Sequence, residues 1–438
     1  MSKITWSFVT IVAVGLALPL SNLVGFSGEN APIFTISGSS EKFTHVSQIL
    51  QNKCVDCHSP GMTRMPIYAN FPIAQSLMAK DIEQASGRFT LTKQVYSGEQ
   101  PFTPLMLAQL EGVIRSNLMP PNLYLSMHWT DSLSVNEKQQ ILAWISEENE
   151  KVALGQKLFH DTRLSGDDTL SCASCHDLTK GGTDQAKVST GIQGQKGGIN
   201  SPTVYNAMYN VAQFWDGRAK HLQEQAAGPV ANLIEMGAKW DEVVEKLKQI
   251  AEYQAAFDTL YPKDGLTKTT VTDAIATFEK SLVTPNSRFD QYLRGNDSVL
   301  NADEKAGYAL FKENCTSCHF GAALGGASFE KMGAKRDYFK LRGSEMTEAD
   351  NGHFNFTKQE KDRYFFKVPV LRNIEQTAPY FHDGSVTNLA DVVRIMAQVQ
   401  RDKELTNEEV NKIVAFLKTL TGEYKGKSVI KLTKDDVN

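Results

Sequence analysis

Residues 172–176 read Cys172-Ala173-Ser174-Cys175-His176, and the same spacing occurs as Cys54-Val55-Asp56-Cys57-His58 and as Cys315-Thr316-Ser317-Cys318-His319. A C-x-x-C-H segment is typical of c-type haem attachment: the cysteines bind the porphyrin through thioethers and the histidine ligates the iron. A single copy is also compatible with a zinc or redox site. The three motifs contain all six cysteines of the chain. We therefore expect three covalently bound haems c.

The composition fits a folded, exported protein of several domains. The chain has 438 residues, a formal net charge of -4, 41% hydrophobic residues and 22% charged residues. These values argue against disorder, and the absence of a basic run argues against a nucleic-acid partner. No cysteine remains for a disulfide. Because c-type haem is attached outside the bacterial cytoplasm, the chain must carry an export signal.

The N-terminus supplies a candidate for that signal. Lys3 precedes an uncharged segment from Ile4 to Gly28. This is longer than the apolar core of a typical cleaved signal and long enough to span a bilayer. We expect residues 1–28 to form an uncleaved anchor, a single inner-membrane span with the catalytic part in the periplasm. The alternative is cleavage after the small residues Gly25 and Ser27, which would release a soluble periplasmic enzyme.

Met119 is the favoured sixth ligand of the N-terminal haem. It precedes Pro120 and Pro121 and lies 61 residues after His58. Proline blocks helix continuation and pushes the preceding residue into extended geometry, so this methionine is expected on a loop, where small cytochromes c present their axial sulfur. Met119 is alternatively a core residue, and the rival ligands are Met106, Met127 and His128.

Helix signals recur along the chain and predict a mainly α protein. Capping boxes are expected at Ser134 with Glu137, Asn301 with Glu304, and Thr406 with Glu409. Further helices are predicted over Trp240–Leu260 and Val271–Leu282, and a loop over Gly181–Gly198. Units that recur at intervals above one hundred residues indicate repeated domains. We predict three cytochrome-c-like haem domains in tandem behind an N-terminal transmembrane helix, with boundaries at 1–28, 29–149, 150–295 and 296–438.

The sixth ligand of the C-terminal haem is less clear from spacing. Met396 lies 77 residues after His319, but Met332 and Met346 compete for the position. The residues alone do not choose among them.

Several distinctive segments follow one another between about residues 150 and 425, among them Leu154-Gly155-Gln156-Lys157-Leu158-Phe159, Gln213-Phe214-Trp215-Asp216-Gly217-Arg218, Glu224-Gln225-Ala226-Ala227-Gly228-Pro229, Val368-Pro369-Val370-Leu371-Arg372-Asn373 and Thr377-Ala378-Pro379-Tyr380-Phe381-His382-Asp383-Gly384. In these segments and their order the chain resembles the bacterial dihaem cytochrome c peroxidases. The added N-terminal haem domain and the expected anchor resemble the membrane-bound tri-haem branch, which includes quinol peroxidases.

The resemblance implies roles for individual residues. His176 would ligate a peroxidatic haem, and His319 with Met396 a high-potential electron-transfer haem. Trp215 would lie between them, although a tryptophan there is also ordinary core packing. The remaining roles are a peroxide pocket lined by Glu235 and Gln225, and a calcium ion held by Asn200 with the backbone carbonyls of Thr377 and Pro379. The plain alternative for Glu235 is a solvated surface carboxylate.

One position departs from the family pattern. Many dihaem members carry a histidine that blocks the peroxidatic iron until the other haem is reduced. The matching position here is Ile192, and no histidine occurs between Asp177 and Lys220. We therefore expect a peroxidatic iron that is five-coordinate or only water-bound when oxidised, and that needs no reductive activation.

The expected function is the reduction of hydrogen peroxide to water with electrons from the quinol pool, passed through the N-terminal and C-terminal haems. A small cytochrome c is the alternative electron donor. A homodimer is the candidate oligomeric state. A non-enzymatic tri-haem electron carrier is a second reading. A third is an oxidase relative that modifies tryptophan in a partner protein; that branch replaces the axial methionine with tyrosine, and Met396 speaks against it.

Overall fold

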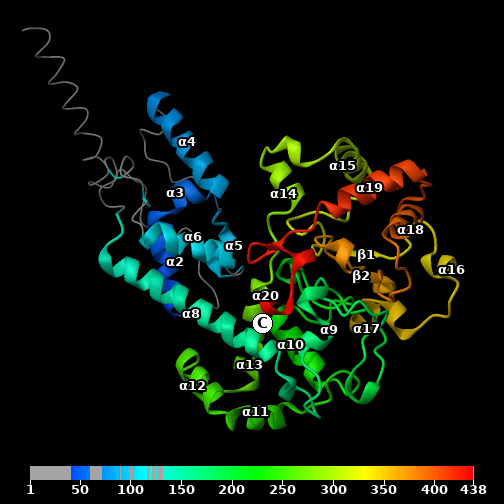
Figure 1. The fold of residues 1–438 in the computed structure, drawn as a ribbon, viewed down its shortest axis with the longest axis horizontal. Coiled ribbons are helices and arrows are strands. Elements are labelled where there is room, and N and C mark those ends of the chain that lie inside the picture. Colours follow the sequence, from blue (N-terminus) through cyan, green and yellow to red (C-terminus); the bar gives the residue numbers. More distant parts are fainter. Residues whose placement is uncertain are drawn as a thin grey trace, which may run out of the picture. The chain divides into compact units, whose positions relative to one another are not determined.

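The computed structural model describes residues 41–59, 72–88, 90–98, 100, 102–115, 119–120, 125 and 132–437. The chain divides into two compact units, residues 1–149 and 150–438. Helices dominate the described parts of both units, as the sequence predicted (Figure 1). The strands of the described residues form two short antiparallel pairs, β1 (Phe329–Lys331) with β2 (Phe365–Lys367) and β3 (Glu423–Tyr424) with β4 (Lys427–Ser428).

The first unit packs around an aromatic centre. The ring centroid of Trp144 lies 5.6 Å from that of Phe43 and 5.0 Å from that of Phe102. Trp144 belongs to α8, whose N-terminal capping box is confirmed: the Ser134 main-chain N–H donates to Glu137 at 2.7 Å. The helices of this unit are α2 (Glu41–Lys53), α3 (Val55–His58), α4 (Pro72–Arg88), α5 (Lys93–Ser97), α6 (Pro104–Arg115) and the first part of α8 (Val135–Phe159).

The second unit contains two helical halves. The first half surrounds the motif helix α9 (Cys172–Cys175) and comprises α10 (Leu222–Ala231), α11 (Trp240–Lys248), α12 (Ala251–Leu260) and α13 (Lys268–Ser281). The single helix predicted over Trp240–Leu260 is wrong in one respect, because the chain breaks between α11 and α12. Neither glycine nor proline marks that break. The apolar side chains on both sides of it, such as Leu247 and Tyr253, are buried in one core.

The second half is built on the crossing of α15 with α19. A Cβ on Gly307 would lie 1.9 Å from the carbonyl oxygen of Lys412, so the crossing requires glycine. The predicted capping boxes at Asn301 and Thr406 are both present. The helices of this half are α14 (Arg288–Leu293), α15 (Ala302–Asn314), α16 (Tyr338–Arg342), α17 (Phe354–Thr357), α18 (Leu389–Arg401) and α19 (Asn407–Lys418).

The C-terminal tail packs against the first half of the second unit. Tyr424, Val429 and Leu432 are buried in the same core as the residues of α13. The last helix, α20 (Lys434–Val437), is held by a 3.0 Å hydrogen bond from the Gln156 side chain to the Val437 carbonyl. Both ends of the second unit thus stabilise the half that carries Cys172.

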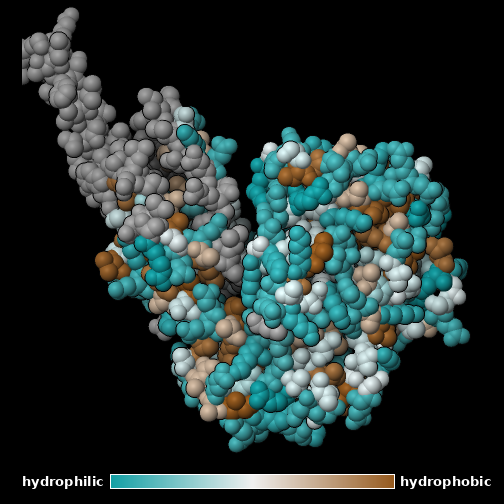
Figure 2. All heavy atoms as spheres, viewed as in Figure 1, coloured by the Kyte–Doolittle hydropathy of each residue, from teal (hydrophilic) through white to brown (hydrophobic). Residues whose placement is uncertain are grey.

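The expected transmembrane helix is corrected by the structure. In the described ranges, no helix is both long enough and apolar enough to cross a bilayer. The longest, α8, has 25 residues but carries charged side chains along its length. The face in Figure 2 is largely hydrophilic, with apolar residues in scattered groups. The predicted N-terminal span and single-span inner-membrane location are therefore withdrawn; residues 1–28, on which they rested, lie outside the described residues.

Candidate active site

A cavity of about 650 Å³ lies in the second unit and brings two of the haem motifs together. Its wall includes both cysteines and the histidine of each motif, Cys172, Cys175, His176, Cys315, Cys318 and His319. Cysteines that face a shared cavity beside a histidine are the arrangement that covalent haem attachment requires. The third motif, with Cys54, Cys57 and His58, lies in the first unit, where His58 is buried on α3.

Both cavity histidines are oriented for iron ligation. The Nδ1 atom of His176 lies 3.4 Å from the Gly182 carbonyl and 3.4 Å from the Ser201 hydroxyl, and that of His319 lies 3.2 Å from the Leu324 carbonyl. A carbonyl at Nδ1 favours protonation there and leaves Nε2 as the metal-binding nitrogen. Burial lowers the pKa of His176, and lowers that of His319 to about 4, which favours the neutral, metal-binding form. The residues therefore fit haem c.

Glu235 and Gln225 line the same cavity as His176. Gln225 projects from α10, and Glu235 follows the turn after that helix. The Asn232 amide donates to Glu235 Oε1 at 2.7 Å, which fixes the carboxyl group and leaves Oε2 available. Burial raises the pKa of Glu235, and Arg218 and the Asn232 hydrogen bond oppose the rise. A carboxyl group with a raised pKa beside an open cavity is suited to proton transfer.

Arg218 is a cavity residue to which the sequence assigned no role. Its guanidinium lies 3.5 Å from the ring centroid of Phe214, and its Nη1 atom lies 3.0 Å from Asp216. Phe214 adopts a left-handed backbone with φ of 66°. A non-glycine residue in that conformation is strained and is held by its surroundings. The matched segment containing Phe214 and Arg218 was a sequence signal, but the electrostatic influence of Arg218 on Glu235 depends on the fold.

The loop around Ile192 lines the cavity, but the Ile192 side chain points away from it. The Ile192 side chain is buried against Gly166 and Gly237 and is not part of the cavity wall, whereas its neighbour Gly191 is. The Ile192 main-chain N–H donates to the Glu235 carbonyl at 2.7 Å. The loop is therefore attached to the segment that carries Glu235.

Trp215 and Asn200 connect the two halves of the second unit. The Trp215 indole N–H donates to the Asn200 carbonyl at 2.9 Å, and the Asn200 main-chain N–H donates to the His382 carbonyl at 2.7 Å. Trp215 also packs against a cluster of the second half that includes Phe366 and Met396. Trp215 thus has a packing role and is also part of the cavity wall that both motifs share.

The predicted calcium ligands Asn200, Thr377 and Pro379 all line the cavity. The Asn200 amide nitrogen donates to the Ala186 carbonyl at 3.0 Å, which leaves the amide oxygen as the atom able to ligate a cation. An amide oxygen with backbone carbonyls is a donor set that calcium accepts. The residues fit calcium to that extent.

The three competing methionines of the second unit occupy different places. Met396 on α18 and the buried Met332 both line the cavity, whereas the Met346 side chain is exposed. In the first unit Met119 is half-buried in a bend, and Met106 packs partly against the core. The rival residues Met127 and His128 lie outside the described residues.

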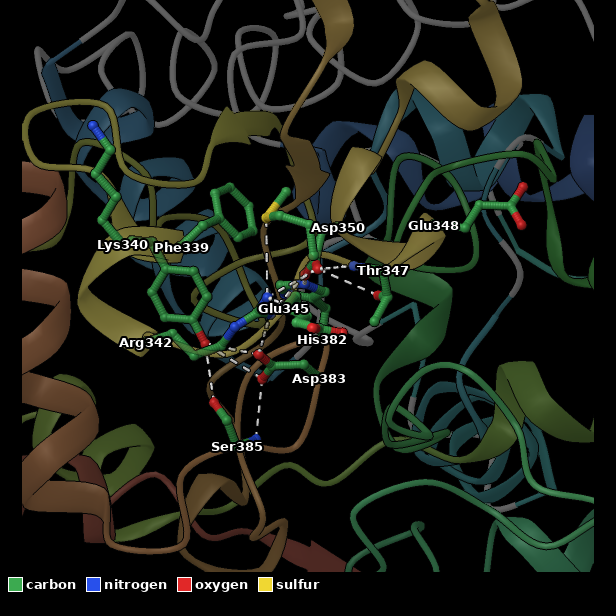
Figure 3. A network of polar contacts seen from close by, with 12 residues as sticks. Phe339, Lys340, Arg342, Glu345, Thr347, Glu348, Asp350, His382, Asp383 and Ser385 are labelled. Atoms are coloured by element: carbon green, nitrogen blue, oxygen red, sulfur yellow. Dashed lines mark hydrogen bonds and ion pairs between the residues drawn. The ribbon is translucent and has the colours of Figure 1, made fainter.

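Asp350, His382 and Asp383 are close enough together to suggest a cation site. Arg342 instead occupies this position, with Nη1 at 2.7 Å from Asp350 and at 2.8 Å from Asp383 (Figure 3). His382 Nε2 lies 2.7 Å from the same Asp350 oxygen. The network is therefore a buried ion-pair cluster that fixes the His382 loop beside Asn200.

Comparison with known proteins decides the family. Residues 149–298 match the model of the di-haem cytochrome c peroxidases, residues 27–147 that of a haem-binding domain, and residues 304–421 that of cytochrome c. Over 94% of its length the chain is 40% identical to the cytochrome c peroxidase Ccp of Escherichia coli K12, covering 97% of that protein. The chain belongs to the di-haem cytochrome c peroxidase family. It is a haem peroxidase that binds haem c covalently.

Other relatives of this peroxidase cover about two thirds of the chain. The cytochrome c551 peroxidase of Nitrosomonas europaea is 47% identical over 66% of the chain and 86% of its own length. A solved structure of a MauG-like protein associated with microbial copper homeostasis aligns with a TM-score of 0.57 at 29% identity, covering 66% of this chain and 92% of that one.

Proposed function

We propose that this peroxidase reduces hydrogen peroxide to water at the haem on His176, with electrons supplied by the haem on His319. The observation that carries the proposal is the common cavity, in which Glu235, Gln225 and Arg218 accompany His176. The haem iron supplies the redox centre for peroxide cleavage when bound. The division into haem domains at 29–149, 150–295 and 296–438, with a third haem on His58 and Met119, belongs to the same proposal.

The chain's residues would move one proton during the reaction. Glu235 Oε2 accepts the proton from the near peroxide oxygen and returns it to the far oxygen, which leaves as water. Its raised pKa favours this uptake, and Arg218 keeps the ionised form accessible. The Gln225 amide orients the peroxide by hydrogen bonding.

The site is proposed to be open in the oxidised protein. Support comes from Ile192, which has no metal-binding atom and packs away from the cavity. The test is electron paramagnetic resonance of the fully oxidised holoprotein, followed by peroxide mixing without a reductant. We expect a high-spin haem signal and an immediate reaction. Three low-spin haems and no reaction would instead show a closed iron that needs reductive activation.

The route between the two haems is proposed to pass Trp215. Replacing Trp215 by Phe keeps an aromatic ring but removes the indole that bonds to Asn200. Trp240→Phe is the matched control, because its indole also donates to a carbonyl, that of Ala227 at 3.0 Å, but lies outside the cavity wall. We expect Trp215→Phe alone to slow electron transfer after peroxide addition by about tenfold, a barrier change of about 1.4 kcal/mol. Equal rates in the two variants would exclude this route.

Quinol is proposed as the donor on the basis of the added N-terminal haem domain, and a small cytochrome c is the second candidate, favoured by the names of the relatives. Turnover with a reduced quinol and with a reduced cytochrome c, each supplied to the holoprotein, separates the two. Turnover with the cytochrome alone would remove quinol.

Calcium at Asn200 is a separate proposal, supported by the donor set described above. Removing calcium with a chelator should slow electron transfer between the haems, because Asn200 also receives the Trp215 hydrogen bond. Restored transfer on adding calcium, but not magnesium, would support the site. An unchanged rate in a sample shown to be free of calcium would refute it.

A further inference from the structure

Lys367 is a buried cation without a partner among the residues that the structure describes. It ends β2, and only 5% of its surface is exposed. Within the described residues, no hydrogen bond or ion pair involves its ammonium group. Burial alone lowers the pKa of Lys367 to about 8, with no carboxylate acting against the shift. Lysine is rarely buried unless it is paired, so this ammonium requires an anion that the described part of the chain does not supply.

The cavity is where such an anion must lie, because Lys367 is part of its wall. The paired strand β1 carries one carboxylate, that of Glu330, which also lines the cavity. Glu330 lies opposite Phe366, whereas Lys367 lies opposite Phe329, so the two side chains project from opposite faces of the strand pair, and no ion pair joins them. Asp216, next to Trp215, is already paired with Arg218.

We propose that Lys367 binds a haem propionate, and that the haem is the one held by His319. The proposal rests on the proposed function only in requiring that haem. A propionate is a carboxylate that enters the cavity together with the cofactor, and it provides the missing counter-charge. Lys367 is two residues from Pro369, and Pro369 and His319 are both part of the cavity wall, which places the ammonium in the same haem crevice.

The pairing has a consequence for electron transfer. The main-chain N–H of Lys367 donates to the Trp215 carbonyl at 2.9 Å, so the buried charge is fixed to the segment between the two haems. A positive charge beside a propionate favours the reduced haem, because reduction adds a negative charge nearby. Lys367 is therefore a positioning residue that raises the potential of the electron-transfer haem.

The test compares Lys367→Met with Lys331→Met in the haem-loaded full chain. Lys331 belongs to the paired strand β1 but is exposed, so its replacement removes the same charge from the same sheet. Midpoint potentials are measured by spectroelectrochemical titration without peroxide. We expect Lys367→Met to lower the potential of the low-spin haem on His319 by at least 59 mV, a tenfold change in the one-electron equilibrium. Lys331→Met and Lys367→Arg should stay close to wild type.

An unchanged potential in fully haem-loaded Lys367→Met would overturn the proposal, as would equal shifts in Lys367→Met and Lys331→Met. If Lys367→Met does not take up haem, the Lys367→Arg variant decides. Haem uptake by Lys367→Arg with a wild-type potential supports a requirement for the positive charge. If neither variant takes up haem, the proposed pairing is overturned. These potentials do not depend on peroxide turnover, so a failure of the proposed peroxide chemistry is recognised separately.

Discussion

The main-chain N–H of Ile192 donates a 2.7 Å hydrogen bond to the carbonyl oxygen of Glu235. This bond joins the loop that lines the cavity to the acid proposed to move the proton. A second bond, from the Gln195 side chain to the Leu233 carbonyl at 3.1 Å, holds the next turn of the loop to the same segment. Loop position and acid position are consequently coupled.

Gly191→Ala should disturb this coupling. A Cβ at residue 191 would lie 1.9 Å from the Ile234 carbonyl oxygen, so the loop and the Glu235 segment must separate. We expect a destabilisation of roughly 1–3 kcal/mol, the usual cost of overpacking, together with reduced peroxide turnover. Denaturant unfolding and turnover of the haem-loaded variant measure both effects. Gly112→Ala, with no atom within 4 Å of its Cβ, is the control. Wild-type behaviour of both variants would show that the contact is unimportant.

Glu235→Gln should remove most peroxide turnover and leave the haem spectra nearly unchanged. Loss of a general base costs about a hundred- to ten-thousandfold in rate. In the wild type, Glu235 must be ionised to accept a proton, and burial raises its pKa. Turnover should therefore fall on acidification at a pH above the ordinary pKa of glutamate, and this limb should disappear in the variant. Glu245→Gln, at an exposed position on α11, is the control. Retained turnover in Glu235→Gln would remove the residue from its proposed role.

Met396→Leu should convert a low-spin haem to high-spin and lower its potential, because thioether ligation stabilises the reduced iron. Met332→Leu is the discriminating comparison, since Met332 lines the same cavity. Absorption and electron paramagnetic resonance spectra of the two holoproteins report the ligand. If the change occurs only in Met332→Leu, the ligand assignment passes to that residue.

Glu279 should make the stability of the holoprotein depend on pH. It is buried on α13, its Oε2 atom has no hydrogen-bond partner, and burial raises its pKa to about 8. Between its ordinary pKa of 4.5 and 8, the folded state keeps a proton that the unfolded state has lost. The free energy of unfolding should therefore fall as the pH rises through this window, by at most about 1.4 kcal/mol per pH unit.

Glu279→Gln should remove this slope, because an amide does not titrate. Denaturant unfolding of the two proteins across the window measures it. Glu242→Gln, an exposed position on α11, should keep the wild-type slope. An unchanged slope in Glu279→Gln would mean that another group is responsible.

The sequence by itself determined the local features of this protein. Haem attachment follows from Cys172, Cys175 and His176 because the chemistry requires two thiols and an imidazole at fixed spacing. The capping boxes at Ser134 and Thr406 were predictable because capping is decided within four residues. The family segments predicted residues that line the cavity, because each segment is a short run of sequence that can be recognised locally.

Only the tertiary structure decided which distant residues meet and which helices persist. Packing between segments far apart in the chain produces the contact of Ile192 with Glu235, the contact of Lys367 with Trp215 and the burial of Glu279. The periodicity of apolar residues carries no information about such contacts. The break between α11 and α12 has no glycine or proline to mark it. It was not predictable because it depends on how both helices pack into one core. The expected transmembrane helix was an inference from Lys3 and the uncharged length that follows it. Among the described residues, no helix is long and apolar enough to cross a bilayer, and the helices bury their apolar faces against one another.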